Sequence, residues 1–126
     1  MSSKAAGKLV LVGTPIGNLS DMSERAAEVI RSCGVVMAED TRRTARLLPE
    51  RRGLFSYHDH NAGGRIPQIL DFLADGQDVA LVSDAGIPGI SDPAYRAVRA
   101  AIEAGYVIEA VPGPSAVICA VAASLT

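Results

Sequence analysis

Glycine, proline and other small residues cluster directly after three apolar segments of the chain. These clusters are the stretches 13–18 (GTPIGN), 84–92 (DAGIPGISD) and 112–116 (PGPSA). Glycine and proline build tight turns without bulky side chains, so a ligand can approach the backbone closely at each stretch. Ordinary turn chemistry would explain any one of them. Three such loops after equivalent segments favour a shared binding site.

The composition of these loops selects among ligands. They contain no lysine or arginine, and they match neither the G-x-x-x-x-G-K-[ST] phosphate loop nor the G-x-G-x-x-G dinucleotide pattern, which disfavours a polyphosphate. They offer Asp84 beside Ile16, Ile87 and Ile90. Such a lining suits a ligand with a purine, a ribose and a positive centre, and S-adenosylmethionine has all three. Asp92 is already explained as a helix cap.

Titratable side chains follow two further apolar segments. Glu39 and Asp40 come after one of them, and His58 and His60 after the other. A carboxylate or an imidazole can remove the proton of a weakly acidic hydroxyl group. Each also has a plainer interpretation, because Asp40 could cap a helix and the histidines could make local hydrogen bonds in a surface loop.

Arginines are concentrated in one part of the chain. A formal net charge of −2 argues against nucleic-acid binding through bulk charge, so any such binding requires a local basic patch. The concentrated arginines are Arg42, Arg43, Arg46, Arg51 and Arg52. They are either a solvated helix face or a contact surface for RNA phosphates.

Five short segments rich in apolar or β-branched residues are predicted as strands, and helical patterns alternate with them. The strands are expected at 8–12, 35–38, 54–57, 79–83 and 107–111. The helices are expected at 22–33 with Gly34 as a stop, at 41–48, around 66–73 with Pro67 near the start and Gly76 as a stop, from Asp92 as N-cap to a stop at Gly105, and from about Pro114 onward.

This alternation predicts an α/β fold, with a largely parallel five-stranded sheet and helices on both faces. Ligands of such sheets bind at the carboxyl ends of the strands, where the loops rich in glycine and proline lie. Residues 1–7 are expected to form a flexible tail and residues 8–126 one domain. The apolar helical pattern is still open at Thr126, so a chain cut short is expected.

Five stretches resemble the tetrapyrrole methylase superfamily: LVGTPIGNLSD (11–21), AEDTR (38–42), SYHDHN (56–61), ALVSDAGIPGISDP (80–93) and VPGPSA (111–116). The resemblance implies the N-terminal domain of a two-domain, homodimeric methyltransferase that holds S-adenosylmethionine between its domains. The cofactor contacts that it implies are Pro15, Ile16, Val82, Ser83, Asp84, Ile87, Ser115 and Ala116.

The loop sequences also bear on the substrate. The branch that acts on tetrapyrroles has G-x-G-P-G-D and G-D-P where this chain has GTPIGN and SDA, which fits the branch that acts on RNA. The resemblance then implies methylation of the ribose 2′-hydroxyl of a cytidine in small-subunit (16S) ribosomal RNA, with the arginine cluster contacting RNA. The alternatives are a methylase of a tetrapyrrole intermediate and a non-catalytic nucleotide-binding module.

Other expectations concern the setting of the protein. The sequence lacks an apolar run long enough for a membrane span and a signal-peptide core, so we expect a cytoplasmic protein without membrane contacts. Cys33 and Cys119 are expected to be reduced residues of the core. Methyl transfer from a sulfonium requires no metal, and none is expected.

The base candidates lead to a prediction. If Glu39, His58 or His60 removes the proton of the acceptor hydroxyl, then Glu39→Gln, His58→Ala or His60→Ala should lower turnover of the full-length enzyme by about 100-fold or more. Single-turnover methyl transfer to RNA measures the effect. Wild-type rates for all three variants would remove these side chains from the chemistry.

Overall fold

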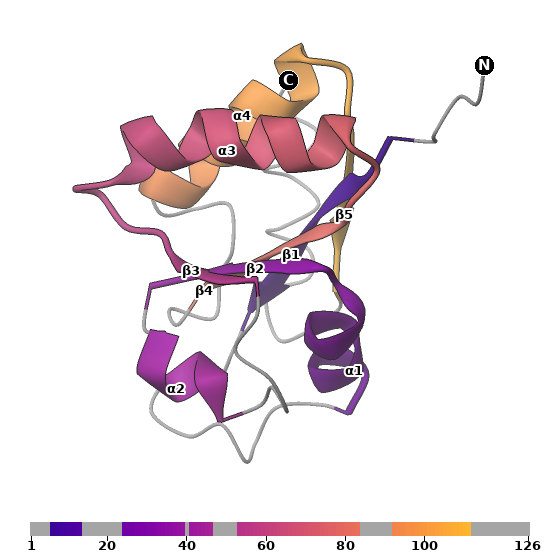
Figure 1. Cartoon of the computed structure of the whole chain (residues 1–126), viewed down its shortest axis with the longest axis vertical. Coiled ribbons are helices and arrows are strands. Elements are labelled where there is room, and N and C mark those ends of the chain that lie inside the picture. Colours follow the sequence, from indigo (N-terminus) through magenta and orange to yellow (C-terminus); the bar gives the residue numbers. More distant parts are fainter. Residues whose placement is uncertain (1–5, 14–23, 40, 47–52, 84–91, 112–126) are drawn as a thin grey trace.

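The computed structural model describes residues 6–13, 24–39, 41–46, 53–83 and 92–111, with the side chains of residues 43, 83 and 92 left out. Strands and helices alternate along these ranges (Figure 1). The strands are β1 (Lys8–Gly13), β2 (Val35–Ala38), β3 (Leu54–Ser56), β4 (Val79–Ser83) and β5 (Val107–Ala110), and the helices are α1 (Glu24–Ser32), α2 (Thr41–Ala45), α3 (Ala62–Ala74) and α4 (Asp92–Glu103).

All five strands form one parallel sheet in the order β3-β2-β4-β1-β5. The chain first moves outward from β1 to β2 and β3, and then returns to place β4 and β5 on the two sides of β1. Parallel crossovers are right-handed, so these opposite directions of travel require helices on opposite faces. Accordingly, α1 and α2 cover one face and α3 and α4 the other (Figure 1). The predicted fold class is confirmed.

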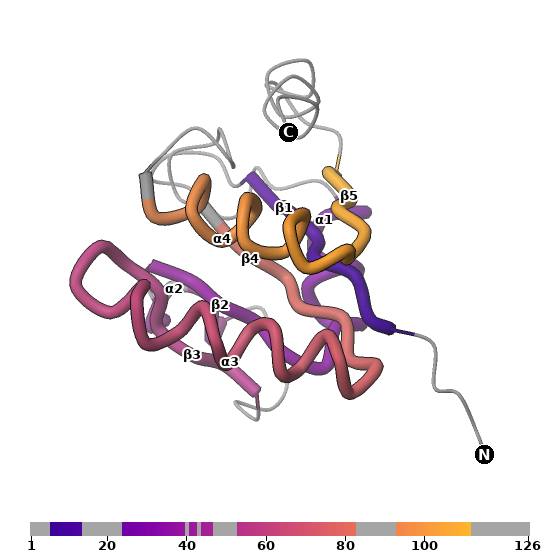
Figure 2. The backbone as a smooth tube through the Cα atoms, turned by 90° about the horizontal axis from the view of Figure 1, so that it is seen from above, coloured from indigo at the N-terminus to yellow at the C-terminus, as the bar shows by residue number. Residues whose placement is uncertain are grey.

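Alternating residues of the strands build two apolar layers. On β1, Leu9 and Leu11 face one layer, while Val10 and Val12 face the other. The first layer packs on α3 and α4, which lie side by side over the sheet (Figure 2). The second layer packs on Ala26 and Ile30 of α1. Both faces of the central strands are therefore buried, which explains why these strands are almost entirely apolar in sequence.

The start of α3 differs from the prediction. Pro67 lies inside the helix, because the helix begins at Ala62 rather than near residue 66. The turn that precedes it starts the helix early: the His58 carbonyl accepts from the backbone amides of Asn61 and Ala62. A proline cannot donate to the carbonyl of residue 63. Gly63 is exposed, so water can solvate that carbonyl.

Two other helix ends depart from the expected pattern. Gly34 follows α1, but it is not among the glycines with positive φ, whereas Gly76 and Gly105 have φ of 89° and end α3 and α4 as expected. The described part of α2 ends at Ala45. Residues 47–52 and the helix expected from Pro114 lie outside the described residues.

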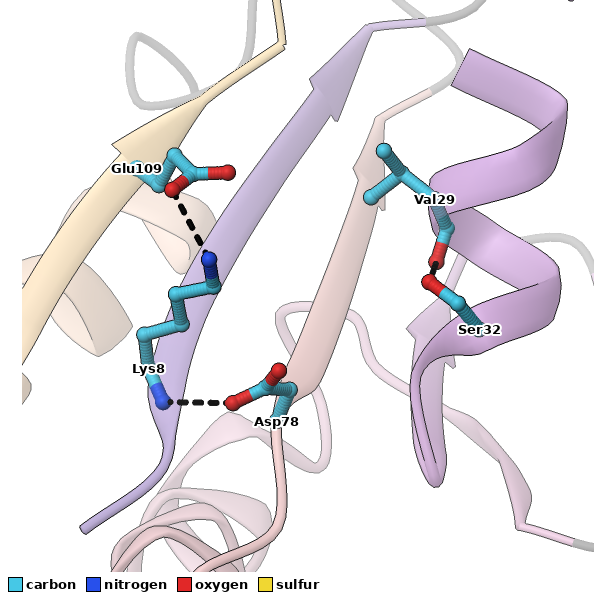
Figure 3. Close-up of polar contacts among 5 residues, drawn as sticks. All are labelled: Lys8, Val29, Ser32, Asp78 and Glu109. Carbon is cyan, nitrogen blue, oxygen red and sulfur yellow. Dashed lines mark hydrogen bonds and ion pairs between the residues drawn. The ribbon is translucent and has the colours of Figure 1, made fainter. Parts of the chain in front are cut away.

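Polar contacts fix the amino end of β1 between its two neighbours (Figure 3). The Lys8 backbone amide donates to Asp78 Oδ1 at 3.0 Å, and Lys8 Nζ lies 2.9 Å from Glu109 Oε2. The hydrogen bond and the charge of Glu109 raise the pKa of the Lys8 ammonium. The ion pair is exposed to water, so it specifies the position of the strand more than it adds to stability.

Cys33 lies near this end of the sheet, directly after α1. It is partly buried and reduced, and it packs against the layer beneath α1. Burial raises the pKa of its thiol to about 11, so the thiol is protonated at neutral pH. This agrees with the expected core residue. Cys119 lies outside the described residues.

The turn before β3 leads to a stability prediction. Gly53 has φ of 78°, and a Cβ atom there would lie 2.3 Å from the Gly34 carbonyl oxygen. Gly53→Ala should therefore lower the free energy of unfolding by about 2 kcal/mol or more. Urea unfolding measures the change.

Gly64→Ala is the matched control. Gly64 lies in α3, and a Cβ there would meet nothing within 4 Å. Alanine is the better helix former, so this variant should be unchanged or more stable by up to about 1 kcal/mol. An unfolding midpoint of Gly53→Ala at or above that of the control would show that the turn accepts a side chain.

Candidate functional site

The ends of three neighbouring strands meet at one edge of the sheet. Gly13 at the end of β1 pairs with Ser83 at the end of β4. On the other side of β1, Leu11 pairs with Ala110 of β5, and the Val111 backbone amide donates to the Leu11 carbonyl at 2.9 Å. The three loops that the sequence analysis singled out begin directly after Gly13, Ser83 and Val111. The sheet therefore brings their starting points together.

Of the expected cofactor contacts, Val82 and Ser83 are among the described residues. Ser83 is the last residue of β4, and the Val82 side chain is 2% exposed, in the apolar layer under α1. The Val82 side chain thus packs in the apolar layer between the sheet and α1, next to the end of β4. The other expected contacts lie outside the described residues: Pro15, Ile16, Asp84, Ile87, Ser115 and Ala116.

The candidate bases lie at the ends of β2 and β3. Glu39 is exposed directly after β2, and His58 and His60 lie in the turn from β3 to α3. His58 is half-buried and His60 exposed, with ring centroids 5.9 Å apart. The His60 backbone amide donates to His58 Nδ1 at 3.2 Å. A neutral His58 ring therefore carries its proton on Nε2, so in this arrangement Nδ1 is already an acceptor and Nε2 is a donor.

Asn61 holds the histidine turn in place. Its Oδ1 accepts from the His58 backbone amide at 2.8 Å, and its Nδ2 donates to the Ser56 carbonyl at 3.2 Å and to Ser56 Oγ at 3.0 Å. One side chain thus joins the end of β3 to the turn. It fixes the backbone of the turn at His58, the first of the two histidines.

Tyr57 connects the same turn to α4. Its ring is buried in the layer under α3 and α4, and its hydroxyl donates to the Pro93 carbonyl in the first turn of α4. The loop at 84–91 leads directly into this turn of α4. The end of β3 and the exit of that loop are therefore fixed relative to each other.

A cavity of about 310 Å³ lies beside β3. It is lined by α2, β3 and α3, through Thr41, Arg42, Ala45, Leu54, Phe55, Ser56 and Arg65. Arg42 belongs to the arginine cluster of the sequence analysis, and Arg46 is exposed at the end of α2. The Arg43 side chain and residues Arg51 and Arg52 lie outside what the structure describes.

Arg65 was missed by the sequence analysis. Its guanidinium group lies 5.4 Å from the Phe55 ring centroid, and its Nε donates to the Ser56 carbonyl at 2.9 Å. In the sequence it is a single arginine within an amphipathic helix, which is most often a solvated residue. The spacing of Arg65 from Arg42 gives no signal, because only the fold brings both to one cavity.

Two further findings limit the chemistry of the described ranges. Their His, Cys, Asp and Glu side chains form no group of three that could hold a metal ion. None of their helices combines the length and apolar character that a membrane crossing requires.

Comparison with known proteins identifies the family. The model of the tetrapyrrole (corrin/porphyrin) methylases matches residues 8–126, and the chain belongs to this family. This match confirms the resemblance that the sequence motifs predicted.

Several curated relatives share one name. Ribosomal RNA small subunit methyltransferase I from Thermotoga maritima is 48% identical over 121 residues, which cover 94% of this chain and 54% of the relative. The protein of that name from Escherichia coli O157:H7 is 44% identical over 126 residues, covering 98% of this chain and 44% of the relative. The chain thus spans about half the length of these curated relatives.

Solved structures share the fold. A conserved hypothetical protein from Aeropyrum pernix K1 has a TM-score of 0.69 at 21% identity, covering 87% of this chain and 40% of that one. Uroporphyrin-III-C-methyltransferase from Thermus thermophilus has a TM-score of 0.63 at 20% identity, covering 86% of this chain and 48% of that one. At these identities the likeness concerns the fold alone.

Asn61 provides the test of this site. Asn61→Ala removes the acceptor for the His58 amide and the donor to Ser56, so it should lower the free energy of unfolding by about 1–2 kcal/mol. Asn61→Asp keeps an acceptor but cannot donate, and should lose about half as much. Chemical denaturation of both variants measures the difference.

Gln68→Ala serves as the comparison. Gln68 is exposed and accepts one hydrogen bond from Arg65, so its loss should change stability by no more than about 0.5 kcal/mol. Equal stability of Asn61→Ala and Gln68→Ala would mean that Asn61 does not hold the turn.

Proposed function

We propose that this chain is the cofactor-binding half of an S-adenosylmethionine-dependent methyltransferase that acts on the ribose 2′-hydroxyl of a cytidine in small-subunit (16S) ribosomal RNA. The observation that carries the proposal is the side-by-side arrangement of Ser83, Gly13 and Val111 at one sheet edge. Membership of the methylase family and the names of the relatives support the reaction class and the substrate.

The residues at this edge fit S-adenosylmethionine. Beyond the three strand ends, the segments 14–23, 84–91 and 112–126 contain no lysine or arginine that would repel a sulfonium ion. Asp84 adds a carboxylate directly after β4. In this proposal, Pro15, Ile16, Val82, Ser83, Asp84, Ile87, Ser115 and Ala116 contact the cofactor. When bound, the cofactor supplies an activated methyl group.

The protein then has to orient the acceptor hydroxyl and to accept its proton. Glu39, His58 and His60 are the proposed candidates. The bond from the His60 amide to His58 Nδ1 weakens the case for His58, because its free ring nitrogen carries the proton in the neutral form. Glu39 and the ring of His60 remain the better candidates for the base.

The arginine cluster is proposed to contact the phosphates of the RNA, through Arg42, Arg43, Arg46, Arg51 and Arg52. Arg42 and Arg46 are both exposed on the α2 side of the sheet. We further propose a homodimeric, cytoplasmic enzyme that needs neither a metal nor a membrane. A second domain, carried by the full-length protein, would close the cofactor cleft.

Methyl transfer by the full-length protein tests the proposal. With labelled S-adenosylmethionine, we expect methylation of small ribosomal subunits that lack the modification, and none of a porphyrinoid substrate. Asp84→Ala and Ser115→Ala should weaken cofactor binding by about tenfold each, if each removes one hydrogen bond to the cofactor. Calorimetric titration with the cofactor measures that loss.

The alternatives make different predictions for the same assays. A tetrapyrrole methylase would label the porphyrinoid and leave the RNA unlabelled. A non-catalytic binding module would take up a nucleotide-like ligand and transfer no methyl group. Absence of cofactor binding by the full-length protein would refute the proposal outright.

A further inference from the structure

The cavity beside β3 lies close to the proposed cofactor edge, but it differs from that edge in charge. Neighbouring strands are about 4.8 Å apart, so the order β3-β2-β4-β1-β5 puts the end of β3 roughly 14 Å from the end of β1. We propose that this cavity binds one phosphodiester group of the RNA substrate, between Arg42 and Arg65. The inference rests on the proposed function and assigns a site for the substrate backbone.

The polar groups that line the cavity are suited to an anion. Arg42 and Arg65 contribute guanidinium groups, Thr41 and Ser56 contribute hydroxyls, and no carboxylate is among the described residues of the lining. Among the described residues, no ion pair neutralises either arginine. Two positive charges at one cavity favour a negatively charged ligand, and the planar guanidinium group matches the oxygens of a phosphate.

Arg65 is oriented before any ligand binds. Its Nε donates to the Ser56 carbonyl at 2.9 Å, its Nη1 donates to Gln68 Oε1 at 2.9 Å, and the group lies over the Phe55 ring. All of these partners are neutral, so the charge of the guanidinium group is kept. A guanidinium group has five N–H donors. The bonds to the Ser56 carbonyl and to Gln68 use two of them, and a longer bond from Nη2 to Ser56 Oγ, at 3.4 Å, uses a third. Among the described residues the other two donors have no acceptor, so they are left for a ligand.

Ser56 adds a hydroxyl that is free to donate. Its Oγ accepts from Asn61 Nδ2 at 3.0 Å and from Arg65 Nη2 at 3.4 Å. A serine hydroxyl can accept two hydrogen bonds and donate one, and no described residue accepts its proton, which is therefore available to a ligand. The hydroxyl therefore acts as a donor in the cavity, where the other polar side chains among the described residues are Arg42, Arg65 and Thr41.

The strand itself contributes to the site because β3 is at the edge of the sheet. The Gly53 carbonyl and the Tyr57 amide bond to β2, so the backbone groups of Leu54 and Ser56 point the other way, in keeping with the alternation of a parallel ladder. On that side, Arg65 Nε and Asn61 Nδ2 both donate to the Ser56 carbonyl. The backbone amide of Ser56 also faces this open edge, and it is a further donor.

The apolar part of the lining is of a suitable size. Ala45, Leu54 and Phe55 supply carbon surface beside the donors. A volume of about 310 Å³ is at the lower end of small-ligand sites, which suits one phosphate with its sugar rather than several nucleotides. A strand of RNA held there could extend toward β4 and β1, where the methyl group would be delivered.

Salt-dependent binding of the full-length enzyme to unmodified small ribosomal subunits tests the inference. Arg65→Ala and Arg42→Ala should each weaken binding roughly tenfold and reduce the slope of log K against log salt by about one. The double variant should lose less than the product of the two single losses, because both side chains bind one phosphate. Arg65→Lys should recover part of the affinity, since it keeps the charge without the planar group.

Arg99→Ala is the matched control. Arg99 is exposed on α4, over the opposite face of the sheet from α2, and its Nε lies 3.0 Å from Glu103 Oε2. Its loss should leave the slope unchanged. Because Arg65 also holds Ser56, thermal unfolding of each variant is measured in parallel. Arg42 is exposed and makes no described contact that stabilises the fold, so Arg42→Ala stays informative if Arg65→Ala unfolds.

The outcomes separate this inference from the proposed function. Wild-type slopes for Arg42→Ala and Arg65→Ala in an enzyme that still methylates RNA would overturn the phosphate site and leave the function intact. If the fold-losses in RNA affinity of the two single variants multiply in the double variant, the arginines bind separate phosphates, and the shared phosphate site is overturned. Displacement of bound RNA by micromolar inorganic phosphate or cytidine monophosphate would mark a site for a free ligand instead. A wild-type enzyme that neither binds cofactor nor methylates RNA would refute the function itself.

Discussion

The parallel pairing of β1 with both β4 and β5 is the constraint on which the rest of the structure depends. Leu9–Gly13 pair with β4 on one side and Lys8–Leu11 with β5 on the other, so the three strands end at nearly the same level. Every loop attached there begins within a few ångströms of its neighbour. The two apolar layers keep this alignment, because each strand is held on both faces.

Charge divides the carboxyl edge of the sheet into two regions. The loops after β4, β1 and β5 carry no cationic side chains in sequence, whereas the β3 end is bordered by Arg42 and Arg65. A positively charged methyl donor and a negatively charged RNA backbone would each find a compatible region. Tyr57 links the two regions, since it follows β3 directly and its hydroxyl donates to the Pro93 carbonyl at the start of α4.

The sequence predicted the strands well and the helix boundaries less well. The bounds of β2 and β4 match the prediction, because buried strands leave a continuous apolar run between loop residues. The helix at Pro67 was placed too late, since a proline signals a start whenever the preceding turn is not recognised. Arg65 could not be found at all. Its partners Ser56 and Phe55 lie on β3, before the turn that leads into α3, and its proximity to Arg42 arises only from the tertiary fold.

The strand order affects how the chain folds while it is being synthesised on the ribosome. β1 is made first, yet both of its neighbours follow much later, and β5 ends only at Ala110. Until β4 has emerged, β1 has no partner strand, because β2 and β3 do not contact it in the sheet. Such distant pairing slows folding. A nascent chain that has just completed β3 therefore still exposes the apolar residues of β1, which makes this interval of synthesis one in which chaperones would matter.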